Sequence, residues 1–237
     1  MDANPFLAVI EGMVQETRLR GGSLADRLDF VRSGVSALDA GFAQTVDRMV
    51  ARLQQARAGT TAPRPGEPMP GFALPDETGR LVTLEALLAD GPLAVTFSRG
   101  HWCPYCRLNN QAIAEARPEF EDLGARVVTI MPERQRFAGA LKADAGAWYP
   151  VLTDMDNGSA LSLNLAVWVG PDMAALMAQA GCDLPQFQGN AAWLLPIPAT
   201  FVVAQNGIIA ARHIDPDYRH RLEIADILTA VRQAAVP

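Results

Sequence analysis

Residues 93–106 read LAVTFSRGHWCPYC, and this stretch decides the fold. The mainly apolar run Leu93–Phe97, in which Thr96 is the one polar residue, predicts a short buried strand, because such a run suits a strand that is covered on both faces. Pro104 favours the first position of a helix, where a missing backbone N–H is tolerated. The sequence therefore predicts a strand, a short loop and then a helix that begins beside Cys103.

The elements around this stretch follow a recognisable order. A helix is predicted over residues 107–116 and a second buried strand over 127–130, so strand, helix and strand form a right-handed parallel crossover. Near the end of the chain, strands at 199–203 and 208–211 flank an Asn-Gly pair, a strong hairpin signal, and an amphipathic helix over 221–233 follows. This is the order of a thioredoxin fold, so we predict an α/β protein with a thioredoxin-like fold, a central mixed β-sheet flanked by helices. The other predicted elements are a hairpin at 72–74 and 81–83, helices at 84–88, 134–145 and 172–179, a strand at 150–152 and a loop at 186–191.

The chain divides at a proline-rich stretch, residues 59–70, whose four prolines exclude a helix or a central strand. Before it, apolar residues recur every three or four positions over residues 24–53, which is a helical period, and glycines within this pattern allow a break. A shorter helical pattern precedes the Gly21-Gly22 pair, and Ser23 is placed to cap the second helix. These helices pack on the main domain or on a second subunit, which leaves a homodimer open. We predict an N-terminal helical extension (1–58), a linker (59–70) and a thioredoxin-like domain (71–237).

The charge of the chain excludes several partners. The formal net charge is −6, so no basic surface is available to attract nucleic acid or an anionic membrane. No apolar run approaches the roughly 20 residues that span a bilayer, and residues 1–5 lack the features of a secretory signal. We therefore expect no nucleic-acid and no membrane partner, and a cytoplasmic location.

Two cysteines three positions apart, Cys103 and Cys106, carry the candidate chemistry. At a helix N-terminus, unpaired backbone N–H groups and the helix dipole favour a thiolate on Cys103, and Arg99 and His101 can add positive charge. We predict that Cys103 is the nucleophile and that its pKa lies below that of Cys106. Cys106 lies about one helical turn further on, where it can resolve the product into a disulfide.

The cysteines also allow other readings. Two thiolates can be half of a zinc site, but there is no second cysteine pair, and only His101, His213 and His220 could complete the ligand set. We therefore expect no metal and no organic cofactor. Cys182 has no partner visible in the sequence, and we interpret it as a small packed residue that stays a thiol.

Pro198 stands directly before a predicted strand. Proline is tolerated at the first position of a strand, so Pro198 can simply mark where the strand begins. A cis X-Pro bond, however, turns the backbone of a loop in an unusual direction and is seldom accidental. We predict a cis bond between Ile197 and Pro198 beside the dithiol.

Several segments resemble the peroxiredoxin-like branch of the alkyl hydroperoxide reductase/thiol-specific antioxidant (AhpC/TSA) superfamily. Residues 99–106 match its RGxWCPYC pattern, residues 70–76, 195–203 and 215–218 look like further segments of that family, and the N-terminal helices resemble its usual extension. The resemblance implies a thioredoxin fold, a redox-active disulfide and antioxidant activity. The implied site consists of Cys103 and Cys106 and is shaped by Arg99, His101, Trp102, Pro104, Tyr105, Pro198 and Thr200.

The sequence departs from peroxiredoxins at two positions. They usually have Thr or Ser three residues before the reactive cysteine, where this chain has Gly100. They also carry an arginine where a strand like Ala199–Val203 begins, and here that place is Pro198. The sequence thus lacks both of the groups that usually polarise a peroxide. Arg99 is the candidate substitute for the missing arginine.

Two classes of function fit these observations. The first is an oxidoreductase in which Cys103 attacks a peroxide or disulfide substrate and Cys106 closes a disulfide, which a thioredoxin- or glutathione-type thiol reductant then reduces. The rival is a non-catalytic redox sensor or zinc clip whose N-terminal helices bind a partner protein. Trp102 and Tyr105 shape the pocket rim in the first reading, and aromatic core packing is the alternative for both.

Overall fold

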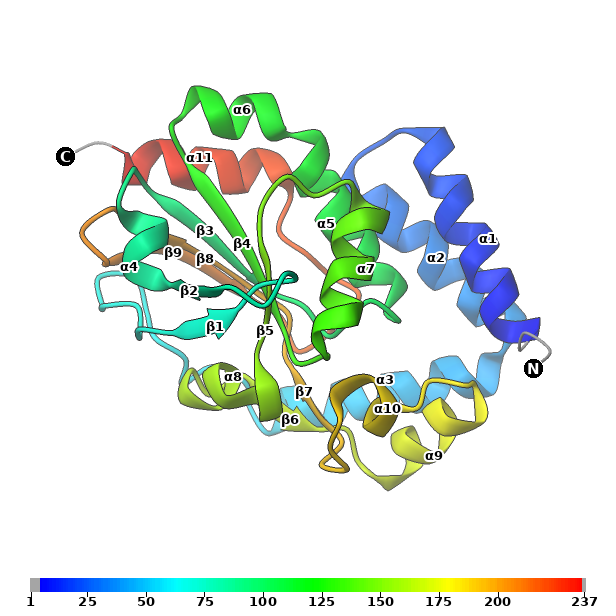
Figure 1. The fold of residues 1–237 in the computed structure, drawn as a ribbon. Coiled ribbons are helices and arrows are strands. Elements are labelled where there is room, and N and C mark those ends of the chain that lie inside the picture. The colour runs from blue at the N-terminus through cyan, green and yellow to red at the C-terminus, as the bar shows by residue number, and fades with distance from the viewer. Residues whose placement is uncertain (1–4, 236–237) are drawn as a thin grey trace.

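A five-stranded sheet forms the centre of the structure, a computed structural model that describes residues 5–235. Its strands are β3 (Leu93–Phe97), β4 (Arg126–Met131), β5 (Val151–Thr153), β8 (Ala199–Val203) and β9 (Ile209–Ile214). They lie in the order β5-β4-β3-β8-β9 (Figure 1). The pairs β3-β4 and β4-β5 are parallel, and the pairs β3-β8 and β8-β9 are antiparallel. The predicted α/β class and thioredoxin-like fold are confirmed.

A small hairpin and several helices cover the two faces of the sheet. The elements that cover one face or the other are β1 (Ala73–Pro75), β2 (Leu81–Thr83), α4 (Leu84–Leu88), α5 (Pro104–Glu115), α6 (Arg117–Asp122), α8 (Gly158–Ser162) and α11 (Ile224–Ala234). Val95 and Phe97 pack with the β1-β2 hairpin, α4 and α8 on one face. Ala94 packs with α5, α6 and α11 on the other face. Because β3 is buried on both faces, its sequence does not alternate and is apolar at every position except Thr96, whose Oγ1 lies 2.8 Å from Thr129 Oγ1.

Three helices form the N-terminal extension: α1 (Pro5–Arg20), α2 (Leu24–Leu38) and α3 (Ala40–Gln55). Ser23 caps α2 as predicted, in a reciprocal capping box with Asp26. The break between α2 and α3 falls at Asp39, whose Oδ1 accepts the N–H of Phe42 at 2.8 Å, and not at a glycine. All three helices share one hydrophobic cluster with Cys103 and with α9 (Pro171–Gln179). The division of the chain into separate domains remains a prediction.

Residues 154–196 contain elements that the sequence pattern did not predict. The strands β6 (Ala166–Trp168) and β7 (Leu194–Pro196) form a separate two-stranded sheet, and α10 (Leu184–Gln188) overlaps the segment predicted as loop. These elements are too short to show a hydrophobic period. The remaining elements are α7 (Gln135–Ala145) and the 3₁₀ turn η1 (Met155–Asn157). Among the described helices, none combines the length and the apolar character needed to cross a membrane.

Candidate active site

The dithiol lies where the chain leaves β3 and begins α5. Cys103 is the N-cap residue and Pro104 the first helical residue, as predicted. Both thiols are reduced and have no solvent exposure. One turn later, Asn110 Nδ2 donates to the carbonyl of Cys106 at 2.8 Å, and Asn110 Oδ1 accepts from Thr129 Oγ1 at 2.6 Å. This buried polar link fixes the start of α5 against β4.

The two sulfurs have different polar partners. Cys106 Sγ accepts the backbone N–H of Arg99 at 3.2 Å and lies 3.5 Å from the donor Nη2 of Arg221. Burial opposes a charge on Cys106, but the hydrogen bond from Cys103, the Arg221 charge and the Arg99 N–H together hold its pKa well below the usual thiol range. Burial and the neighbouring Cys106 raise the pKa of Cys103.

The predicted order of acidity is therefore wrong. It assumed that the free N–H groups of α5 would face the sulfur of Cys103. Instead, the N–H groups of Cys106 and Arg107 donate to the carbonyl oxygen of Cys103, at 3.1 Å each, and its sulfur makes no capping hydrogen bond. The donors that stabilise a thiolate converge on Cys106.

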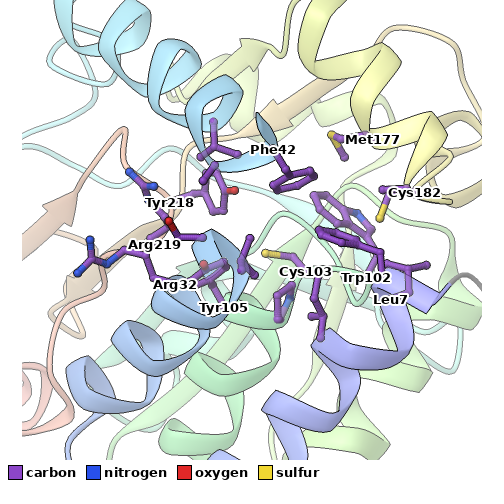
Figure 2. A pocket seen from close by; sticks show the side chains of 18 of the residues that line it. Leu7, Arg32, Phe42, Trp102, Cys103, Tyr105, Met177, Cys182, Tyr218 and Arg219 are labelled. Atoms are coloured by element: carbon purple, nitrogen blue, oxygen red, sulfur yellow. The ribbon is translucent and has the colours of Figure 1, made fainter. Parts of the chain in front are cut away.

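Cys103, unlike Cys106, lines a pocket of about 470 Å³. Figure 2 shows its sulfur in the middle of the pocket, with Arg32 and Arg219 on one side and Met177 and Cys182 on the other. Of the predicted site residues, the pocket also brings together Arg99, Trp102, Pro104 and Tyr105. Of the two cysteines, only Cys103 borders this pocket.

Arg99 supplies a positive charge beside the thiols. Its side chain is buried, with its guanidinium carbon 3.7 Å from the ring centre of Tyr218 and 5.0 Å from that of Trp102. Burial works against this charge, but Cys103 and Tyr218 are the main groups that raise the pKa of Arg99, so it stays protonated. Tyr218 also packs edge-on against Tyr105, with ring centres 5.4 Å apart.

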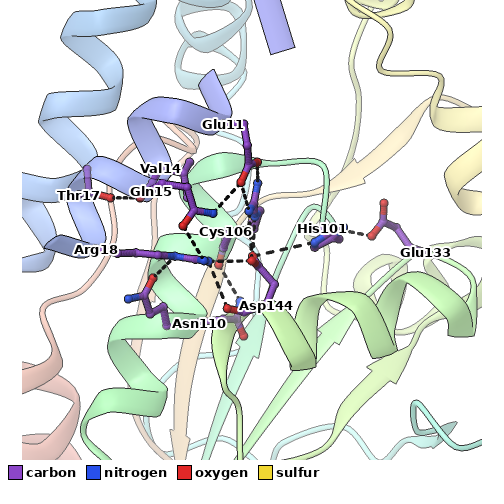
Figure 3. A network of polar contacts seen from close by, with 12 residues as sticks. Glu11, Val14, Gln15, Thr17, Arg18, His101, Cys106, Asn110, Glu133 and Asp144 are labelled. Atoms are coloured by element: carbon purple, nitrogen blue, oxygen red, sulfur yellow. Dashed lines mark hydrogen bonds and ion pairs between the residues drawn. The ribbon is translucent and has the colours of Figure 1, made fainter. Parts of the chain in front are cut away.

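His101 does not line the pocket of Cys103 and lies between Asp144 and Glu133 (Figure 3). Its backbone N–H donates to Glu133 Oε2 at 2.6 Å, and its Nε2 lies 4.0 Å from Asp144 Oδ2. Burial, assisted by the charge of Arg107, lowers the pKa of His101, so the imidazole is neutral at neutral pH. The expectation that His101 adds positive charge at Cys103 is therefore wrong.

Glu133 is a site residue that the sequence analysis missed. It follows β4, is fully buried, and its Oε1 has no hydrogen-bond partner among the described residues. Burial raises its pKa to about 8, against the hydrogen bond from His101, and the nearby Cys106 raises it further. The only sequence signal was a carboxylate directly after a predicted buried strand.

Position 100 accepts only glycine, because Trp102 and Glu133 lie close to its Cα atom. Its φ is +148°, and a Cβ atom there would lie 2.6 Å from Trp102 Nε1 and 2.7 Å from Glu133 Cδ. The Thr or Ser that the family resemblance would place at this position has no room. The departure from the peroxiredoxin pattern thus follows from the packing of Trp102 and Glu133.

Pro198 and Thr200 do not line the pocket of Cys103. Every peptide bond in the described part of the chain is trans, so the predicted cis bond at Pro198 is wrong. The segment before it already pairs as β7, and the N–H of Ile197 donates to Leu165 at 2.8 Å, which leads the chain directly into β8. Pro198 lines a small apolar cavity on the other side of Arg99, and Thr200 is buried in β8 opposite Thr96.

Cys182 is half-buried and lines the same pocket as Cys103. Burial raises its pKa to about 11, so it is a thiol at neutral pH. Within residues 5–235, no group of three or more His, Cys, Asp or Glu side chains is arranged to hold a metal ion.

A charged network ties the extension to the dithiol helix (Figure 3). Arg107, the residue after Cys106, donates to Asp144 at 2.6 Å and to Glu11 of α1 at 2.5 Å. Arg18 of α1 also pairs with Asp144, at 2.9 Å. This network fixes α1 beside α5 and α7.

Comparisons with known proteins support the fold described above. Residues 65–212 match the model of the AhpC/TSA family. No curated protein sequence gives a significant match. Among solved structures, the chain is similar to the peroxidoxin BcpB from Mycobacterium tuberculosis, with 21% identity over 73% of this chain and 99% of that one and a TM-score of 0.56.

Two further structures show the same fold. Peroxiredoxin Q from Xanthomonas campestris has 17% identity over 75% of this chain and 96% of its own, with a TM-score of 0.52. A mutant of peroxiredoxin 6 from Arenicola marina has 14% identity over 70% of this chain and 71% of its own, with a TM-score of 0.55. Since the family model covers more than half of the sequence, the chain belongs to the AhpC/TSA family.

Proposed function

We propose that this protein is a peroxiredoxin-like thiol oxidoreductase that reduces peroxides or disulfides, with Cys103 as the nucleophile and Cys106 as the resolving thiol. The observation that carries the proposal is the difference between the two sulfurs. Cys103 faces the pocket, whereas Cys106 receives the Arg99 N–H and the Arg221 guanidinium. One sulfur is placed to meet a substrate, and the other is held as a thiolate beside it.

The first step activates Cys103. Its thiol passes its proton to the Cys106 thiolate along their hydrogen bond, so the pair keeps one proton and one negative charge. The Cys103 thiolate attacks the terminal oxygen of a hydroperoxide and the O–O bond breaks. Cys103 becomes a sulfenic acid, and the alkoxide takes the proton from Cys106 and leaves as an alcohol. The buried charge of Arg99 favours the negative charge that develops beside Cys103.

The second step closes the disulfide. The Cys106 thiolate attacks the sulfur of the Cys103 sulfenic acid, the S–O bond breaks, and hydroxide leaves and takes a proton from solvent to form water. A disulfide substrate would give the same product through a mixed disulfide. An external thioredoxin- or glutathione-type thiol then reduces the protein, and we place the reaction in the cytoplasm, where such donors are maintained.

The test is oxidation of the reduced full-length protein by one equivalent of a hydroperoxide or of a small disulfide. We expect two thiols to be lost per chain, much faster than from free cysteine, and peptide mapping to give a Cys103–Cys106 disulfide. Oxidation no faster than free cysteine, or a disulfide from Cys103 to Cys182, would contradict the proposal.

A further inference from the structure

The N-terminal extension builds most of the pocket above Cys103. More than half of the residues that line the pocket belong to α1, α2 and α3, and all of these lie outside the family-matched residues 65–212. The apolar ones come from each of the three helices (Figure 2). They include Phe6, Leu7, Ile10, Val35, Phe42 and Val46.

These helices restrict what can reach Cys103. The cysteine has no solvent exposure, and the extension is held down by ion pairs from Arg107 to Glu11 and from Arg27 to Glu115. The carboxylate of Glu223, just before α11, also accepts the N–H of Ala25 at 2.7 Å. A disulfide on the surface of a folded protein cannot contact the sulfur while these helices are in place.

The size and lining of the pocket point to an organic substrate. Its volume of about 470 Å³ is typical of pockets for small organic ligands. Hydrogen peroxide, about as large as two water molecules, would fill only a small part of it. Met177 of α9 lies across the pocket from Arg32 and Arg219 (Figure 2), and Met173 of the same helix also lines the pocket. An apolar body attached to the peroxide group would therefore be buried beside Cys103.

We propose that the N-terminal helices are the specificity element of this site: they bind the apolar body of an organic hydroperoxide and make hydrogen peroxide and protein disulfides poor substrates. This inference rests on the proposed function of the dithiol. It assigns the extension to substrate selection rather than to binding a partner protein.

Val46 and Val50 of α3 provide a matched pair for the test. Both are buried, with 2% and 4% exposure, and both belong to the same hydrophobic cluster, but only Val46 lines the pocket. The experiment measures rate constants for dithiol oxidation by cumene hydroperoxide and by hydrogen peroxide in the parent, Val46→Phe, Val46→Ala and Val50→Ala. Melting temperatures report whether each variant is folded.

In the parent we expect cumene hydroperoxide to react at least about tenfold faster than hydrogen peroxide, the range that apolar pocket contacts supply. Val46→Phe fills part of the pocket and should slow oxidation by cumene hydroperoxide more than oxidation by hydrogen peroxide, so that the preference is lost. Val46→Ala should change the preference, and Val50→Ala should not, although both lose the same methyl groups from the core.

The outcomes separate this inference from the proposed function. Fast oxidation by both peroxides without a preference in the parent would overturn the specificity role and leave the dithiol chemistry intact. Equal effects of Val46→Ala and Val50→Ala on the preference would also overturn it. Oxidation of the parent by neither peroxide would overturn the specificity role, and oxidation by neither peroxide nor a small disulfide would overturn both. Should Val46→Phe not fold, the parent ratio and the two alanine variants still decide the question.

Discussion

Cys103 and Cys106 are one helical turn apart, yet their sulfurs lie in opposite surroundings. Cys103 faces a pocket with apolar walls from α1, α2, α3 and α9, which Arg32, Arg99 and Arg219 also line. Cys106 faces polar groups of the main fold, namely the Arg99 N–H, Arg221 and the neighbouring Glu133. The difference shows that access and charge are provided by different parts of the chain. The extension controls access to Cys103, and the loops of the thioredoxin-like fold control the charge on Cys106.

The groups around Cys106, namely the Arg99 N–H, Arg221 and Glu133, form the polar side of the dithiol. Among them, Glu133 is expected to have the largest effect, which is on stability. Its pKa of about 8 in the folded state lies above its ordinary value of 4.5, so folding favours the protonated form. The stability that this provides is complete below about pH 4.5 and is lost as the pH rises through 8. Relative to Glu133→Gln, which stays neutral, the parent should lose roughly 4 to 5 kcal/mol of unfolding free energy over this range.

Urea unfolding of both proteins at several pH values measures this difference. Glutamine keeps an acceptor for the N–H of His101, so the comparison isolates the ionisation of the carboxyl. A difference between the two proteins that is constant from pH 5 to pH 8 would show that Glu133 ionises freely and does not belong to the polar side of the dithiol.

A smaller effect is expected at Arg221, the cation nearest to Cys106. Arg221→Gln removes a positive charge whose donor atom lies 3.5 Å from Cys106 Sγ. The pKa of the first thiol to ionise should rise by about 1 to 3 units. Arg221→Lys keeps the charge and should restore most of the shift. The ultraviolet absorbance of the thiolate as a function of pH gives the thiol pKa of each protein. Identical titrations of the parent and Arg221→Gln would show that Arg221 does not stabilise the Cys106 thiolate.

The smallest effect is expected at Cys182, which shares the pocket with Cys103 but not its polar surroundings. Its pKa of about 11 leaves about one molecule in 10⁴ as thiolate at pH 7. Cys182→Ala should leave the oxidation rate and the disulfide of the dithiol unchanged, and the parent should show no covalent dimer on non-reducing gels. A slower closure of the disulfide in Cys182→Ala would make Cys182 a second resolving thiol.

The parts of the fold that the sequence predicted well depend on local signals. Leu93–Phe97 is a mainly apolar run, Leu84–Leu88 directly follows a strand whose last residue, Thr83, caps the helix, and Pro104 starts a helix. All three elements were predicted with correct or nearly correct bounds. Their patterns reflect burial and backbone geometry that neighbouring residues determine. The short elements between Asp154 and Pro196 lack such patterns because they are stabilised by contacts distant in sequence.

The site shows the same limit. The motif located the dithiol and four of the pocket residues, but the order of acidity depends on Arg221, which is 115 residues away from Cys106. Glu133 reaches the loop of His101 only through the pairing of β3 with β4. A proline before a strand is compatible with either a cis or a trans peptide bond, so the local sequence around Pro198 could not decide between the two. The pocket walls from α1 to α3 depend on tertiary packing that no motif records.

Trapping the oxidised sulfur tests most directly whether Cys103 is the nucleophile. Cys106→Ser should stop at a sulfenic acid after one equivalent of cumene hydroperoxide, and dimedone followed by peptide mapping should label Cys103. Cys103→Ser should give no dimedone adduct and should lose at least about 10³-fold in oxidation rate, because Cys106 does not line the pocket. The opposite result, a labelled Cys106 in Cys103→Ser and fast oxidation of that variant, would contradict the assignment of Cys103 as the nucleophile.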